Sequence, residues 1–107
     1  IGTFQRVQDH IIVSLTEAEA IKWTSYEAVW RLDGGHADAS TGISMAKAVA
    51  SDGFSKCCDS SQNVHAGVGV DLDLGLTHYT VRSRTFQHYL GDATFHRRRM
   101  AQLMNLG

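Results

Sequence analysis

The chain has 107 residues, of which 43% are apolar, with ten basic and eleven acidic side chains. This length suits one small domain with a single core, and the near balance of charge excludes the basic surface typical of proteins that bind nucleic acid or a membrane surface. No apolar run approaches the ~20 residues that span a bilayer, and no secretion signal opens the chain. We therefore expect a cytoplasmic protein with no membrane span and no nucleic-acid partner.

The first predicted helix covers residues 3–33. Apolar side chains recur along it at intervals of three and four residues, which predicts a buried stripe on one face. Gly34 and Gly35 then offer a C-terminal stop. Trp23 also lies at helical spacing, and its neighbourhood of aromatic residues favours packing in a core or at an interface over stacking on a cofactor. The stripe comprises Phe4, Val7, Ile11, Leu15, Ala18, Tyr26, Val29 and Trp30.

Three more helices are predicted by the same periodicity. The second follows Asp38 and Ser40, either of which can cap it, and runs for about 25 residues to a break at 66–69. A third run of near-helical spacing ends at Gly91, and Asp92 caps a fourth helix. The apolar positions are Ile43, Ala46, Ala50, Phe54, Cys57 and Val64 in the second, Leu76, Tyr79, Phe86 and Leu90 in the third, and Met100 and Leu103 in the fourth.

Four helices with short connections predict an all-α fold, an antiparallel up-and-down four-helix bundle forming a single domain over residues 1–107. The alanine-rich second stripe permits close helix packing. A core of this size is marginal alone, so we expect further burial against missing sequence or a partner subunit. The opening residues contain no Met and no clear helix start, which favours a fragment of a longer protein.

Other reactive side chains favour ordinary structural roles. No two histidines stand four residues apart and no carboxylate cluster completes a ligand set, so no metal site is predicted. Cys57 and Cys58 are adjacent in a helix, where their side chains diverge by ~100°, which excludes a disulfide or a chelating pair and favours packing. The run 97–99 of three arginines fans around a helix, which is typical of a solvated or dipole-balancing cluster more than of a phosphate site.

Small residues gather in the segment NVHAGVGVD, residues 63–71. Glycine serves either a simple chain reversal or a backbone that another group approaches closely. The spacing would also let several backbone amides face an anion. The residues alone leave both interpretations open.

Four segments resemble, in order and separation, the carboxy-terminal helical domain of the acyl-CoA dehydrogenase family of flavoproteins. They are IGTFQRVQDHI at the start of the first helix, SMAKAVASD in the second, QNVHAGVGV at its end, and YLGDATFHRRRMAQLM near the end of the chain. The similarity covers essentially the whole sequence. It implies that an amino-terminal helical domain, a middle β-domain and one more helix precede Ile1 in the complete protein.

The resemblance implies an FAD-dependent oxidoreductase of lipid metabolism. Such an enzyme removes the α-proton and the β-hydride of an acyl-CoA substrate, producing the trans-2-enoyl-CoA, and passes electrons to an electron-transfer flavoprotein. It also implies a homo- or heterotetramer that assembles through the helical domain.

The resemblance further implies which residues bind cofactor and substrate. Two segments match positions that contact the FAD of a neighbouring subunit, where small side chains let the backbone reach the diphosphate; a third lies along the cofactor beside the reaction centre, and Gly91 contacts substrate. The cofactor-binding residues are Phe4, Gln5, Asn63, Val64, His65, Ala66 and Gly67 in the first two segments, and Asp92, Ala93 and Thr94 in the third.

Three positions depart from the family pattern. Asn63 stands where glutamine is common, Ala66 replaces the first glycine of a pair, and Leu90 occupies the place where many members carry the catalytic glutamate. Leucine cannot accept a proton, so no catalytic residue is assigned in this chain. The chain's glutamates, Glu17, Glu19 and Glu27, all lie on the first helix, far in sequence from Gly91, and we do not assign any of them as the base.

Three hypotheses account for the missing base. The glutamate projects from a helix upstream of Ile1, or the chain belongs to a non-catalytic subunit of a heteromeric dehydrogenase, or it belongs to a relative with another substrate or with lost activity. A hypothesis of another class is a cofactor-free helical module that binds a protein through Trp23 and Trp30.

Overall fold

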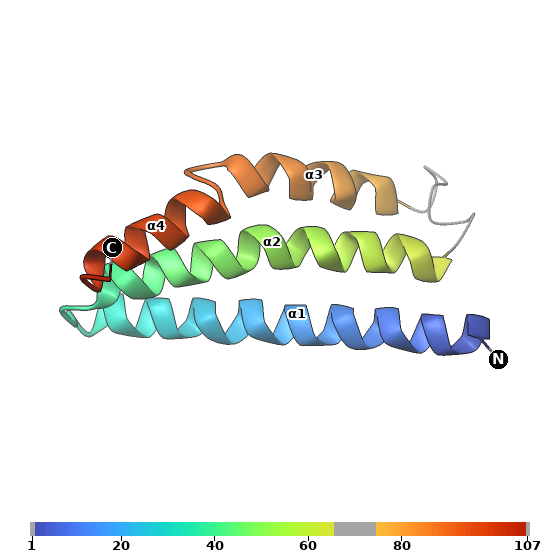
Figure 1. Cartoon of the computed structure of the whole chain (residues 1–107), viewed down its shortest axis with the longest axis horizontal. Coiled ribbons are helices and arrows are strands. Elements are labelled where there is room, and N and C mark those ends of the chain that lie inside the picture. Colours follow the sequence, from blue (N-terminus) through green and yellow to red (C-terminus); the bar gives the residue numbers. More distant parts are fainter. Residues whose placement is uncertain (1, 66–74, 107) are drawn as a thin grey trace.

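The computed structural model describes residues 2–65 and 75–106, which contain helices and no strand. The helices are α1 (Gly2–Asp33), α2 (Ala39–His65), α3 (Leu76–His88) and α4 (Ala93–Leu103) (Figure 1). The all-α prediction is confirmed, and the helix limits agree closely with the sequence-based ones. The predicted break at 66–69 lies outside the described residues.

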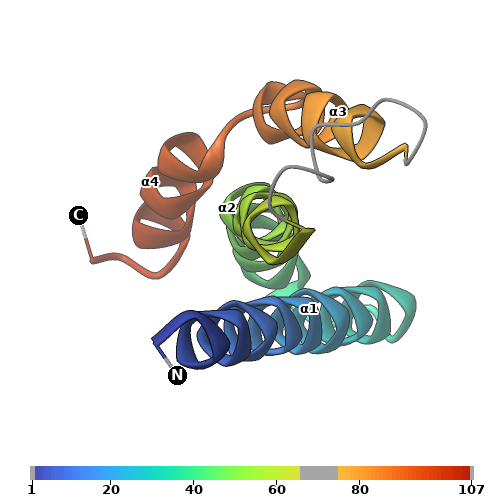
Figure 2. The ribbon, with the colours of Figure 1, turned by 90° about the vertical axis from the view of Figure 1, so that its right-hand side faces the viewer.

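Helix α2 is the central element. α1 lies along one side of it, and α3 and α4 follow one another along the opposite side (Figure 2). α1, α2 and α3 alternate in direction, whereas α4 continues the course of α3 (Figure 1). The described residues therefore form three rods, the third of them broken, and the predicted up-and-down four-helix bundle is not confirmed. The reason is local: the link at residues 89–92 offsets the chain sideways without reversing it.

Two predicted helix ends have the expected chemistry. At the end of α1, the amide of His36 donates to the carbonyl of Arg31 at 3.0 Å, and Gly35 has φ +67°. This pattern is a glycine-terminated C-cap. At the start of α4, the carboxylate of Asp92 accepts a hydrogen bond from the amide of Phe95 at 2.8 Å, which is the predicted N-cap.

The side chains buried around α2 are small. The buried positions of α2 carry mainly serine, alanine and glycine. They are not the predicted stripe, because every residue of that stripe is half-buried or exposed, so the prediction that this stripe packs in the core is wrong. The buried apolar residues are Ala28, Ala39, Ala48, Cys58 and Ala93, and the buried serines are Ser44, Ser51, Ser55, Ser60 and Ser83.

The apolar stripe predicted for α1 does not face α2. Leu15, Val29 and Trp30 are 62%, 65% and 63% exposed. The face turned to α2 is largely polar: the thiol of Cys57 donates to the Ser14 carbonyl at 3.4 Å. The expectation that the stripe forms the core of this chain is therefore wrong. Periodicity shows which residues share a face, but it does not identify what covers that face.

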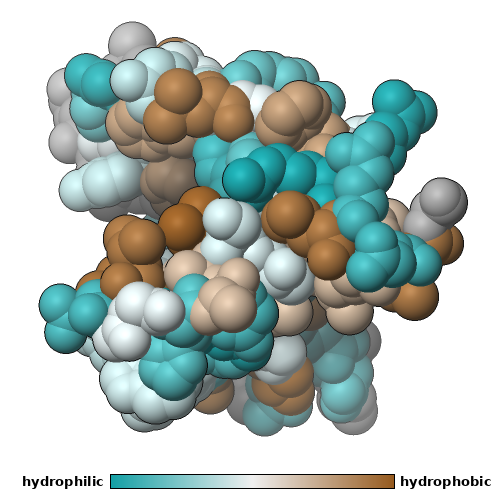
Figure 3. Space-filling model, turned by 90° about the vertical axis from the view of Figure 1, so that its left-hand side faces the viewer, coloured by the Kyte–Doolittle hydropathy of each residue, from teal (hydrophilic) through white to brown (hydrophobic). Residues whose placement is uncertain are grey.

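The chain leaves an unusual amount of surface uncovered. Its accessible area is 7319 Å², whereas a folded monomer of 11.8 kDa has about 5,900 Å². Apolar side chains stand on the surface at the end of the molecule where the α1–α2 turn and α4 lie (Figure 3). These faces fit the expectation of further burial against other protein.

Candidate functional site

The link between α3 and α4 has a backbone conformation that few residue types favour. Leu90 has φ +59° and Gly91 has φ +99°, and such left-handed values disfavour any residue but glycine. A Cβ on Gly91 would also lie 2.6 Å from Cδ1 of Phe95 and 3.0 Å from Nε2 of His96. Glycine is therefore required at 91 by both conformation and space. Leu90 beside it is 75% exposed.

A buried polar network underlies this link. His96 is 8% exposed, and its ring joins the Leu90 carbonyl, 2.9 Å from Nε2, to the Ser44 hydroxyl, 3.2 Å from Nδ1. Arg99 donates to the same hydroxyl at 2.6 Å and to the carbonyl of Ser40 at 3.2 Å. Ser44 itself is fully buried. The network thus ties the link and the first turns of α4 to α2.

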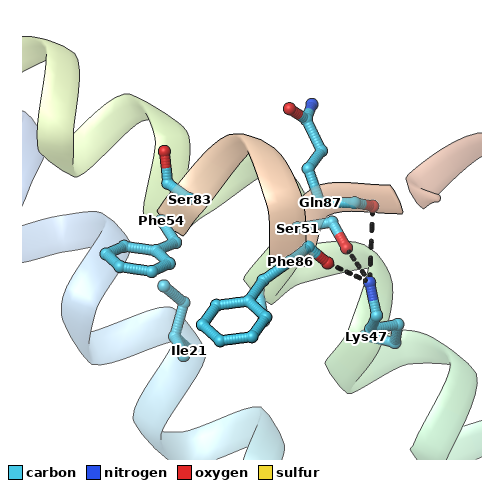
Figure 4. Close-up of a pocket in the computed structure, with 8 residues that line it drawn as sticks. Ile21, Lys47, Ser51, Phe54, Ser83, Phe86 and Gln87 are labelled. Atoms are coloured by element: carbon cyan, nitrogen blue, oxygen red, sulfur yellow. Dashed lines mark hydrogen bonds between the residues drawn. The ribbon is translucent and has the colours of Figure 1, made fainter. Parts of the chain in front are cut away.

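Lys47 contacts the other end of the link. Its Nζ donates to the carbonyls of Phe86 and Gln87 at 3.0 and 3.4 Å and to the hydroxyl of Ser51 at 2.6 Å (Figure 4). A cation placed on the last carbonyls of a helix satisfies them and complements the helix dipole. Burial lowers the pKa of Lys47, and the charge of Asp92 opposes that shift.

A cavity of about 280 Å³ adjoins Lys47. Phe54 of α2, Phe86 of α3 and Ile21 of α1 converge on it (Figure 4). Its apolar lining leaves Lys47 as the one charged side chain among the lining residues. The cavity lies between three helices, α1, α2 and α3.

The structure brings together the predicted residues that follow α3. Gly91 and Asp92 are half-buried, Ala93 is buried and Thr94 is exposed in the first turn of α4. The carboxylate of Asp92 is engaged by the amide of Phe95. With the exposed Leu90, these residues form one short segment on the side of α2 opposite α1 (Figure 2).

The other predicted cofactor residues lie at the far end of the molecule. Asn63, Val64 and His65 form the last turn of α2, and the start of α1, with Phe4 and the exposed Gln5, lies at the same end (Figure 1). The Phe4 side chain, like Ala66 and Gly67, lies outside the part of the chain that the structure describes.

Two of these side chains form hydrogen bonds with the backbone of their own helix. The amide of Asn63 donates to the Asp59 carbonyl at 2.9 Å, and Nδ1 of His65 lies 2.8 Å from the Ser61 carbonyl. Ser44 lies beside the α3–α4 link. At a rise of about 1.5 Å per residue, Asn63 lies about 28 Å farther along α2. The predicted residues therefore form two separate groups.

The cysteines have the environment of packed side chains. Burial, the charge of Glu17 and neighbouring Cys58 raise the pKa of Cys57. Burial is also the main cause that raises the pKa of Cys58. Both shifts disfavour the thiolate that a nucleophile requires, which supports the packing interpretation.

The arginine run is only partly solvated. Arg97 pairs with Asp52 of α2, Arg99 joins the Ser44 network, and Arg98 is exposed. Sequence reasoning found the run but missed Ser44, Lys47 and His96 as residues that hold the link. One signal was present in the sequence: His96 lies in the second turn after the predicted cap, Asp92.

The described residues offer neither a metal site nor a membrane-spanning helix. Residues 2–65 and 75–106 hold no group of three or more histidine, cysteine or acidic side chains placed to bind a metal ion. Within that same part of the chain, no helix combines the length and apolar character that crossing a membrane requires.

Comparisons with known proteins identify relatives. The chain is 26% identical over 98 residues to (R)-benzylsuccinyl-CoA dehydrogenase of Thauera aromatica, a match that covers 92% of this chain and 24% of that protein. Two solved structures, the FAD complex of PigA and PigA with FAD and proline, match 99% of this chain and 27% of theirs, at 25% identity and a TM-score of 0.91. The chain thus spans about a quarter of the length of these relatives.

The family comparison covers nearly the whole sequence. Residues 1–104 match the model described as acyl-CoA dehydrogenase, C-terminal domain. The helical order α1 to α4, the offset after α3 and the high structural similarity to flavin-containing relatives agree with that match. The chain therefore belongs to the acyl-CoA dehydrogenase family, to its carboxy-terminal helical domain.

Proposed function

We propose that this chain forms part of an FAD-dependent dehydrogenase that introduces an α,β double bond into an acyl-CoA thioester, to which it contributes FAD contacts and a subunit interface. The observation that carries the proposal is the family match over residues 1–104. The relatives named as a CoA-thioester dehydrogenase and as an FAD complex support the substrate class and the cofactor.

The exposed link fits a group that approaches the backbone closely. In this proposal the carbonyl of Gly91 faces the thioester, while its amide donates to the His88 carbonyl at 3.3 Å. Ala93 and Thr94 at the start of α4 lie along the flavin. The close fit of Gly91 against Phe95 and His96 leaves the backbone, not a side chain, at the surface. When bound, FAD supplies the acceptor for the β-hydride. The side chain of Asp92 caps α4 and fixes the direction of the first turn.

The second group of residues serves a different FAD molecule. Gln5, Asn63 and His65 expose polar side chains at the end where α1 begins and α2 ends. A separation of about 28 Å along α2 from Ser44 to Asn63 makes one shared cofactor a poor fit. We therefore assign the α3–α4 link to one FAD and the end of α2 to the FAD of a neighbouring subunit. Phe4, Val64, Ala66 and Gly67 belong to this same proposed contact.

The catalytic base comes from outside this chain. Glu17 pairs with Lys56 at 3.6 Å, and Glu19 accepts a hydrogen bond from Trp23 at 2.8 Å. Both lie on α1, on the opposite side of α2 from the link (Figure 2). A base must reach the α-proton directly or through one water. We therefore assign the base to a residue of the complete subunit, or of a catalytic partner subunit, outside these residues.

The outward face of α1 is the proposed assembly surface. Its large apolar side chains, among them Tyr26, Val29 and Trp30, are more than half exposed. Contiguous apolar surface of this kind marks contact with other protein. The proposed occupants are the rest of the subunit and the neighbouring subunits of a homo- or heterotetramer, and the proposed electron acceptor is an electron-transfer flavoprotein.

The test uses the full-length protein purified with its natural partners. We expect a yellow protein whose flavin band bleaches under anaerobic conditions when an acyl-CoA is added. A 2,2-dimethylacyl-CoA is the matched control, because it lacks the α-proton and cannot be dehydrogenated. Bleaching by both compounds, or by neither in the presence of all subunits, would contradict the proposed reaction.

The same experiment separates the alternatives. A yellow protein that bleaches only after a second subunit is added is a non-catalytic partner in a heteromeric dehydrogenase. A protein that stays colourless after FAD is added favours a helical interaction module, for which the exposure of Trp23 and Trp30, 59% and 63%, is the specific support.

A further inference from the structure

Two side chains one turn apart on α2 contact the α3–α4 link from its two ends. Lys47 donates to the last carbonyls of α3, at Phe86 and Gln87. Ser44 lies against His96 in the second turn of α4, 3.2 Å from its Nδ1. Because α2 is a continuous helix, the spacing of these two anchors is fixed. The ends of the link are therefore held at a set separation.

Both ring nitrogens of His96 have hydrogen-bond partners. The Leu90 carbonyl only accepts, so Nε2, at 2.9 Å, donates to it. Nδ1 lies 3.2 Å from the Ser44 hydroxyl, which also accepts a hydrogen bond from Arg99 at 2.6 Å. Within the described residues, no buried side-chain nitrogen or oxygen lacks a partner.

The link needs such support. Leu90 and Gly91 are consecutive residues with positive φ, and a bulky side chain in that region is disfavoured unless its surroundings impose it. The hydrogen bond from His96 restrains the carbonyl of Leu90 itself. Without it, the backbone at Leu90 could return to the negative φ that a leucine favours. That change would move the segment proposed to face substrate and flavin.

We propose that Ser44, His96 and Lys47 are positioning residues that fix the α3–α4 link, and through it the backbone of Gly91, for the reaction. This inference rests on the proposed function, and it assigns to α2 the task of supporting the reactive segment. None of the three touches the reacting atoms. They act through the carbonyls of Leu90, Phe86 and Gln87.

The test compares variants of the full-length flavoprotein. Ser44→Ala and His96→Leu break the network, whereas His96→Gln keeps a donor near the position of Nε2. Arg98→Gln is the matched control, because Arg98 is exposed on the same helix and lies outside the network. Hydrogen exchange of peptides covering residues 88–95 reports how strongly the network restrains the link. Exchange in α1 reports whether the rest of the fold is intact.

The disrupted variants should show exchange at 88–95 faster by about tenfold or more, with α1 unchanged. At saturating acyl-CoA, flavin reduction should slow by about tenfold or more while FAD content and KM change little, because misplacement of a reactive segment acts on the chemical step. His96→Gln should restore most of both properties. Arg98→Gln should match the unaltered protein. Should Ser44→Ala fail to fold, the contrast between His96→Leu and His96→Gln carries the test.

Two results would overturn the inference. Unchanged exchange at 88–95 in the disrupted variants would mean that the network does not hold the link. Faster exchange with an unchanged rate of flavin reduction would mean that the hold has no role in the reaction. A protein that binds no flavin would instead refute the proposed function, and faster exchange in the same variants would still support the hold on the link.

Discussion

Substitution of Gly91 by alanine tests the geometry of the link most directly. Two costs are expected. Alanine at a positive φ costs about 1–2 kcal/mol relative to an ordinary conformation, and φ here is +99°. The new Cβ would also lie 2.6 Å from Cδ1 of Phe95. The Phe95 ring is 54% exposed, so moving it aside costs about 0.5–1.5 kcal/mol, the cost of an unfavourable side-chain rotation. Together these contributions predict a loss of about 1.5–3.5 kcal/mol.

The matched control is Gly35→Ala. Gly35 has φ +67°, and a Cβ added to it would meet no neighbouring group within 4 Å, so it incurs the conformational cost alone, about 1–2 kcal/mol. A second control is Gly91→Ala in a Phe95→Ala background. Because the ring that the Cβ would strike is then absent, the cost of Gly91→Ala should fall by about 0.5–1.5 kcal/mol, a coupling typical of residues in contact.

Native-state hydrogen exchange in the full-length protein supplies the measurement. It reports the local opening free energy of the α4 amides in Gly91→Ala and of the α1–α2 turn in Gly35→Ala. The reasoning is refuted if Gly91→Ala costs no more than Gly35→Ala. It is also refuted if removal of the Phe95 ring leaves the cost of Gly91→Ala unchanged.

Three further predictions follow from other contacts. Lys47→Met removes the hydrogen bonds to the last carbonyls of α3 and should lower the opening free energy of that helix end by about 1 kcal/mol, measured by hydrogen exchange at residues 84–89. Trp30→Glu on the exposed face of α1 should reduce the mass of the assembled protein in light scattering. The pKa of Cys57 is raised in the fold. The contribution of the protonated thiol to folding stability is therefore complete below the ordinary thiol pKa and is lost as pH rises through the raised value. Iodoacetamide should alkylate Cys57 about tenfold more slowly in the folded than in the urea-unfolded protein at pH 8.

Helix limits could be predicted from the sequence because they depend on adjacent residues. The glycines at 34 and 35 end α1, and Asp92 caps α4 through an amide three residues away. These interactions occur within a single turn, so a single sequence reveals them. The family resemblance added the proposed roles of Gly91 and its neighbours, which local rules could not supply.

The arrangement of the helices depended on contacts that the sequence does not display. His96 meets Ser44 across 52 positions of the chain, and Lys47 meets Phe86 across 39. No periodicity predicts such pairs. The apolar stripe predicted for α1 is expected to be buried in the bundle, whereas in the structure most of it is exposed. The serine and alanine side chains of α2 can pack against a polar face as well as against an apolar one. The sequence pattern therefore does not determine which face of α1 contacts α2.

Many buried side chains around α2 are polar, whereas many large apolar side chains face outward. α1 meets α2 through polar contacts such as Lys56 with Glu17, and α4 meets it through the network of Ser44 and Arg99. Directional hydrogen bonds fix relative position, whereas apolar burial supplies most of the free energy of association. Contacts inside the chain therefore set the register of the helices and the place of the link. The apolar surface that remains, as at Trp30, is available to stabilise the larger protein, so the conformation of the link and the assembly of the protein are expected to respond to separate substitutions.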